Sequence, residues 1–248
     1  MTELFASLAP AILILFIIRY LDRKNPEPKK QMAIGVFYGV LSTLLSLCFT
    51  EFVIPFAFCW ISWASAIPIV SSFYSSFIDA ALPEETAKLI MLWLLLRKNK
   101  YYDEYFDGIV YAVCVGMGFA GFENVLYVVG DEDWQSVALM RAFLSVPGHY
   151  MFAVLMGLFY SLVHFNPERF GKYKWMVLIA PILAHGIYDT ICDLAGTLPD
   201  FLGIIIEIGL ILFCIKLHIY CAKKMKNIKL FDQDRYDLEA FEKGMSNY

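Results

Sequence analysis

The sequence predicts an all-α fold, a multi-pass bundle of transmembrane helices. Hydrophobic residues make up 59% of the 248 residues and charged residues 18%, whereas soluble domains are closer to half apolar and a quarter charged. Apolar runs recur at the length that crosses the hydrocarbon core, about 20 residues, and basic residues gather in alternate connections. We therefore expect residues 1–222 to form one integral membrane domain and residues 223–248 a short polar cytoplasmic tail.

Seven apolar runs are long enough to span, and the predicted spans are Leu4–Tyr20, Met32–Cys59, Phe73–Leu96, Phe106–Val129, Val137–Phe165, Trp175–Leu194 and Phe201–Tyr220. The first lacks a basic flank and a small-residue cleavage site, so we interpret it as a retained span. The second is over-long, and Gly35 and Pro55 are expected to tilt or kink it. The uncharged segment Cys59–Ser72 contains two tryptophans, which predicts an interfacial or re-entrant loop. An eighth span is the alternative there.

The orientation of the chain across the membrane is predicted from the distribution of the lysines and arginines among the connections. Eighteen of the 20 lie in or beside the first, third and fifth connections and the C-terminal segment. The opposite connections carry none, and one of them reads GDEDW, residues 130–134. Because basic loops stay in the cytoplasm, we expect the N-terminus outside and the C-terminus inside, in the cell membrane.

The two remaining cations, Lys88 and Arg141, fall inside predicted spans, where an ionisable group costs about 2.5–3.5 kcal/mol. Other embedded polar residues are Asp79, Glu84, Glu85, Glu123, Asn124, His149, His185, Asp189, Asp193, Glu51 and Glu207. Glu51 and Glu207 are alone in their spans, and we interpret them as locally hydrogen-bonded or snorkelling side chains. Asp79 and Asp193 are interpreted as interfacial residues. The remainder cluster on four spans, which predicts a functional site.

Helical spacing groups these residues further. Positions four apart lie about 40° from each other around a helix, so Glu84 and Lys88 share a face, as do His185 and Asp189. Pro147, which precedes His149 by two residues, is expected to distort its helix. Three glycines before Glu123, at positions 116, 118 and 121, form a small-residue surface that lets helices approach closely. That approach would bring Glu123 to the other carboxylates.

Two hydrolytic schemes use such residues. In one, a glutamate acts as general base on water while a histidine assists. In the other, Zn²⁺ activates the water, with Glu84, Glu123, His149 and His185 as candidate ligands. The zinc sequence HExxH, the nucleophile elbow GxSxG and the phosphate loop GxxxxGK[ST] are absent from the sequence. We favour the glutamate scheme, which needs no cofactor, and leave Zn²⁺ open.

Three segments carry a family resemblance. PEETAK, residues 83–88, resembles the EExxK motif of the PrsW family of intramembrane proteases; GFAGFENVLY is similar to its FxxxEN run at Phe119, Glu123 and Asn124; HGIYD is similar to its HxxxD motif at His185 and Asp189. The resemblance implies a core of Glu84, Glu85 and His185. We expect His149, Glu123 and Asp189 to take part in catalysis, with Lys88, Asn124 and Arg141 in support.

The resemblance also implies a substrate and partners. It implies cleavage of a single-span membrane protein, such as an anti-sigma factor, on its extracytoplasmic side, with the lipid bilayer as the other partner and no nucleic acid. The alternatives are a proton-coupled transporter, an embedded zinc amidase acting on lipid, and a catalytically idle scaffold. A transporter would be expected to show inverted repeats, and zinc amidases usually use three histidines, whereas only His149 and His185 are deep here.

Overall fold

The computed structural model describes residues 1–58 and 68–245, and all regular structure in these two ranges is helical. Six helical runs are long and apolar enough to cross a membrane: Thr2–Leu21, Lys29–Phe56, Tyr105–Val128, Trp134–Phe165, Met176–Thr197 and Phe201–Arg235. The predicted all-α, multi-pass architecture is confirmed. Most of the predicted loop Cys59–Ser72 lies outside the described residues, but its end is wrong, since Pro68 already begins a helix.

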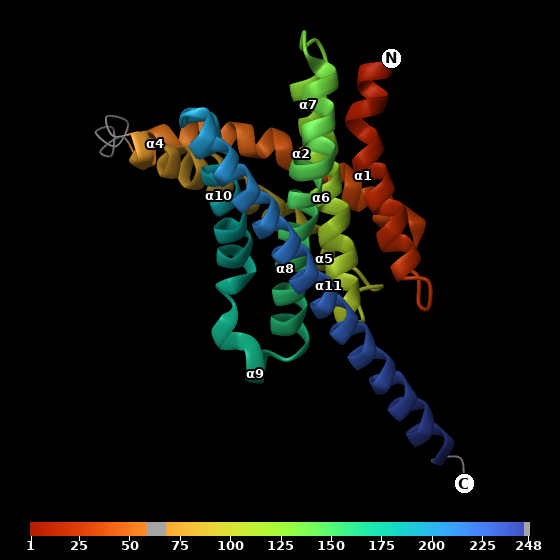
Figure 1. Cartoon of the computed structure of the whole chain (residues 1–248). Coiled ribbons are helices and arrows are strands. Elements are labelled where there is room, and N and C mark those ends of the chain that lie inside the picture. The colour runs from red at the N-terminus through yellow and green to blue at the C-terminus, as the bar shows by residue number, and fades with distance from the viewer. Residues whose placement is uncertain (59–67, 246–248) are drawn as a thin grey trace.

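The third predicted span is a continuous helix of α4 (Pro68–Tyr74), η3 (Ser75–Ala81) and α5 (Leu82–Leu96). It is not among the six apolar runs because Asp79, Glu84, Glu85 and Lys88 interrupt its hydrophobicity. The count of seven spans and the orientation of the termini therefore stay predictions. In Figure 1 the α4 end lies at the edge of the molecule, whereas α5 reaches its centre.

The other helices surround α6 (Tyr105–Val128), most of whose residues are buried. They are α1 (Thr2–Leu21), α2 (Lys29–Cys48) with η1 (Phe49–Val53) and α3 (Ile54–Phe58), α7 (Trp134–Met140) with η4 (Arg141–Ser145) and α8 (Val146–Phe165), α9 (Pro167–Phe170) with η5 (Gly171–Tyr173), α10 (Met176–Thr197) and α11 (Asp200–Met245). The main packing partners of α6 are α8, α2 and α1.

Each of the segments η1, η3 and η4 is a π-helical turn that ends two residues before a proline: Pro55, Pro83 and Pro147. Proline lacks an N–H, and its ring clashes with the carbonyl four residues earlier. A π-turn contains an extra residue and relieves that clash without ending the helix. The expected distortion before His149 therefore takes the form of η4. The π-turn η3 precedes Glu84 in the same way.

Glycines bring α2 and α8 against α6. A Cβ at Gly39 would lie 2.1 Å from the Val115 carbonyl oxygen, and one at Gly118 would lie 2.1 Å from the Val36 carbonyl oxygen. A Cβ at Gly116 would meet the Ala153 side chain at 2.7 Å. The small-residue surface predicted on this helix is thus used for close packing, and it places Glu123 next to α8.

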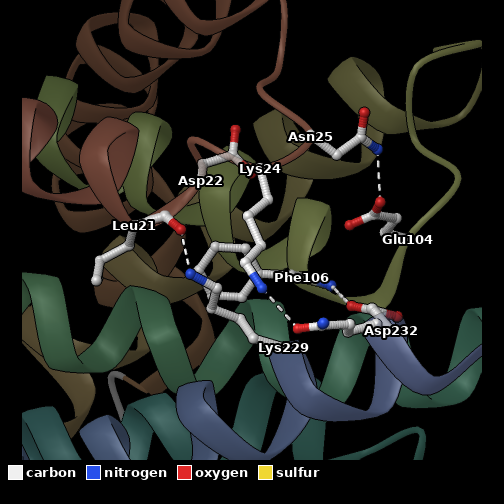
Figure 2. Close-up of a pocket in the computed structure, with 9 residues that line it drawn as sticks. Leu21, Asp22, Lys24, Asn25, Glu104, Phe106, Lys229 and Asp232 are labelled. Atoms are coloured by element: carbon white, nitrogen blue, oxygen red, sulfur yellow. Dashed lines mark hydrogen bonds between the residues drawn. The ribbon is translucent and has the colours of Figure 1, made fainter. Parts of the chain in front are cut away.

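The cytoplasmic-tail segment predicted from residue 223 continues α11 as helix, and this helix crosses the bundle diagonally. Figure 2 shows how it docks: Lys229 donates to the carbonyl of Leu21 at the end of α1, and Asp232 accepts from the Phe106 N–H at the start of α6. Asp232 also accepts from the Tyr105 N–H at 3.1 Å. Two helix ends are therefore capped by side chains of α11. The boundary at residue 222 stays a prediction.

Candidate active site

The embedded polar residues come together from four helices. Glu84, Glu85 and Lys88 lie on α5, Glu123 and Asn124 on α6, His149 on α8, and His185 and Asp189 on α10. Five of them line a cavity of about 590 Å³: Glu84, Glu123, His149, His185 and Asp189. Its polar lining consists of Glu84, Glu123, Arg141, Ser145, His149, His185, Asp189 and Glu207. The constellation that the sequence predicted is therefore formed, although the role of each residue stays a prediction.

Lys88 lies at the centre of the group. Its Nζ is 2.8 Å from Glu85 Oε1, 3.3 Å from Glu84 Oε2 and 3.2 Å from His149 Nδ1. An ammonium has three donors and no acceptor, so these three contacts use all of its protons. The Nζ also lies 3.8 Å from the centroid of the Phe119 ring, a cation–π contact. Lys88 is thus a fixed buried cation rather than a mobile one.

The two adjacent glutamates differ in their access to the cavity. Glu85 is completely buried, with its Oε1 bound to Lys88 and to His185. Its Oε2 is buried without a hydrogen-bond partner among the described residues. The Glu84 side chain is 16% exposed and lines the cavity. A water molecule in the cavity can therefore reach Glu84 but not Glu85.

His185 is held from both sides of its ring. Nδ1 lies 2.9 Å from Glu85 Oε1, and Nε2 lies 3.1 Å from Asp189 Oδ2. The i,i+4 pairing with Asp189 predicted from the sequence is confirmed. The ring stacks on Phe152 with centroids 4.8 Å apart and an interplanar angle of 18°. Because both nitrogens face carboxylates, both can donate a hydrogen bond, and Nε2 also lies 3.9 Å from Glu84 Oε2.

His149 links Lys88 to Glu123. Since the ammonium can only donate, Nδ1 of His149 accepts, and Nε2 donates to Glu123 Oε2 at 3.0 Å. Arg141 donates to Glu123 and to Asn124, each at 2.5 Å. Arg141 is therefore engaged by two side chains of α6 rather than by the glutamates of α5.

One carboxylate of the cavity was not expected from the sequence. Glu207 of α11 lines the cavity, although it is the only charge in the apolar run from Phe201 to Ile215. An isolated charge in a span is costly, and this cost was the signal that could have pointed to it. Helical spacing could not have predicted the place of Glu207 at the cavity, because no other polar residue shares a helix face with it.

The donor set that could hold a metal ion, within the described residues, consists of Glu84, Glu85, His149 and His185, whose ligand atoms lie within 4.8 Å of one another. The sequence had suggested Glu123 as a candidate ligand and not Glu85; in the structure Glu123 binds Arg141 and His149, and its role as a ligand stays a prediction. Carboxylate and imidazole donors suit Zn²⁺, and the unpartnered Oε2 of Glu85 offers a free lone pair. The donors fit a metal, but three of them already bind the Lys88 ammonium.

Comparison with known proteins decides the family. Residues 27–217 match the model of the PrsW family intramembrane metalloproteases. The chain belongs to the PrsW family. It is 33% identical over 193 residues to a protein named Protease PrsW of Clostridioides difficile (strain 630), covering 75% of this chain and 76% of the relative. It is 31% identical over 188 residues to Protease PrsW of Bacillus subtilis (strain 168), covering 75% and 80%. No solved structure matches the chain.

Family membership and fold agree on the class of protein. A PrsW-family member with several membrane-crossing helices is a multi-pass membrane peptidase. The matched range contains every residue of the Glu/His group and of the cavity lining described above. The family resemblance predicted from the three sequence segments is therefore confirmed.

Proposed function

We propose that the protein hydrolyses a peptide bond in a single-span membrane protein, on the extracytoplasmic side, with Glu84 as general base. One observation carries this assignment: of the two adjacent glutamates, only Glu84 reaches the cavity. Glu85 is completely buried and holds Lys88 and His185 in place. In this proposal Glu84 is the reactive carboxylate of the pair and Glu85 is the positioning carboxylate.

The proton transfers follow from the distances. Glu84 takes a proton from a cavity water as the water oxygen attacks the scissile carbonyl carbon. His185, through Nε2, donates a proton to the amide nitrogen as the C–N bond breaks. The proton held by Glu84 then passes through a cavity water to Nε2, which lies 3.9 Å from Glu84 Oε2. One water is consumed, and the two residues regain their initial states.

Neighbouring groups position these two residues. Lys88 balances part of the negative charge of the glutamate pair, and Asp189 and Glu85 fix the His185 ring. A divalent metal bound by Glu84, Glu85, His149 and His185 would polarise the carbonyl and activate water. The ammonium already provides a positive charge against three of those donors, which supports the glutamate scheme.

The test is Glu84→Gln, which keeps size and hydrogen bonding but removes the base. We expect cleavage of a single-span reporter protein in phospholipid vesicles to fall by a factor on the order of 10² or more, with normal membrane insertion. Glu51→Gln is the matched control, because Glu51 lies in a predicted span but does not line the cavity. Normal cleavage by Glu84→Gln, or equal losses in both variants, would contradict the assignment.

A further inference from the structure

The cavity contains one carboxylate that has no partner among the described residues. The pairs are Glu84 with Lys88 at 3.3 Å, Glu123 with Arg141 at 2.5 Å and Asp189 with His185 at 3.1 Å. Glu207 on α11 lines the same cavity, but no ion pair or hydrogen bond of its side chain is formed in the described part of the chain. Glu207 is exposed, so its unpaired carboxylate is open to a group that enters the cavity.

Glu207 lines the same cavity as the residues of the proposed chemistry. It is seven residues into α11 from Asp200, and Asp189 is eight residues before the end of α10 at Thr197. At 1.5 Å per residue, both lie about 10–12 Å from the connection between the two helices, which pack against each other. Both residues thus lie at a similar distance along their helices from this connection, and both line the cavity.

The surroundings of Glu207 suit an incoming helix rather than an ion. Its neighbours Ile204 and Ile208 are exposed, as they would be towards lipid. Met140 of α7, which lines the same cavity, is 58% exposed. α11 packs on α10 and α8 but has few contacts with α7 and η4, although all of them contribute to the cavity. Leu144 of η4 and Leu210 and Ile211 of α11 line the cavity together with Glu207, and this apolar lining is called the seam below.

We propose that Glu207 binds a lysine or arginine side chain of the substrate, within a few residues of the bond that is cut. The occupant of the seam is a single-span membrane protein whose apolar segment ends in such a cation. A cation is favoured over a neutral donor because every other carboxylate of the cavity already has a basic or imidazole partner, and charge complementarity gives specificity. This inference rests on the proposed proteolytic function.

The experiment uses the full chain reconstituted in phospholipid vesicles with single-span reporter proteins. The reporters carry Lys, Gln or Glu at successive positions within four residues on either side of the cut site. We expect the wild type to cleave a Lys reporter on the order of tenfold faster, in kcat/KM, than the matched Glu reporter at one or two positions. Glu207→Gln should remove this preference, so that the Lys and Glu reporters are cleaved at the same rate, and Glu207→Lys should reverse it.

The matched control is again Glu51→Gln, which should keep the Lys preference. Retention of the preference in Glu207→Gln would overturn the inference, as would cleavage of Lys, Gln and Glu reporters at equal rates by the wild type. Either result leaves the proposed proteolysis standing. If the wild type cleaves none of the reporters while they are fully inserted, both the proposed function and this inference fail.

Discussion

Replacing Lys88 by Met tests the idea that the buried ammonium holds the site together. Met keeps the length and the apolar stem of the side chain but removes the charge and three hydrogen bonds, to Glu84, Glu85 and His149. Lys88 is only 3% exposed, so water cannot replace it. Removing one partner of a buried ion pair costs about 3–5 kcal/mol, and we expect a loss of this size in the free energy of unfolding.

The assay is reversible unfolding in mixed micelles, followed by tryptophan fluorescence. Lys98→Met is the matched control: Lys98 is exposed in the connection after α5, so its loss should stay within about 0.5 kcal/mol. Adding Glu85→Gln to Lys88→Met should recover part of the stability, because it removes the carboxylate left without its cation. A loss below about 1 kcal/mol for Lys88→Met, or no recovery in the double variant, would refute the reasoning.

Four further outcomes are expected. If the ammonium competes with a divalent metal for the same donors, Lys88→Met binds Zn²⁺ more tightly than the wild type in calorimetric titration of metal-free protein; equal affinities would contradict competition. Gly39→Ala would place a Cβ 2.1 Å from a backbone oxygen of α6 and should cost about 1–3 kcal/mol, whereas Gly209→Ala, with open space around it, should not. Burial raises the pKa of Asp22 to about 7, so the folded state binds the extra proton between pH 4 and 7. Stability should fall as the pH rises through this window, and Asp22→Asn should flatten that slope in denaturation measured at several pH values. Asp232→Ala removes a cap from two N–H groups of α6 and should cost about 0.5–2 kcal/mol; an unchanged denaturation midpoint would contradict the docking role of α11.

Helix class and membrane location could be predicted from the sequence because they depend on composition and local order. A run of about 20 apolar residues forms a helix in the bilayer, since every backbone group must be satisfied internally. Helical spacing alone also paired Glu84 with Lys88 and His185 with Asp189, and both pairs are present at 3.3 and 3.1 Å.

The third predicted span has features that its local sequence pattern did not predict. Its helix begins at Pro68, within a segment interpreted as loop. Pro147 indicated that the helix before His149 would be distorted, but not that the distortion would be a π-turn. The π-turn before Pro83, which precedes Glu84, was not predicted.

The sequence by itself determined which residues could carry the chemistry, because charged side chains inside apolar spans are rare and costly. Only the tertiary structure decided their partners. Arg141 binds Glu123 rather than the glutamates of α5, Glu85 rather than Glu123 completes the possible metal-ligand group, and Glu207 reaches the cavity from α11. The physical reason is that contacts between helices depend on crossing angles and on close approaches such as that at Gly39 and Gly118, which bring together residues far apart in the chain.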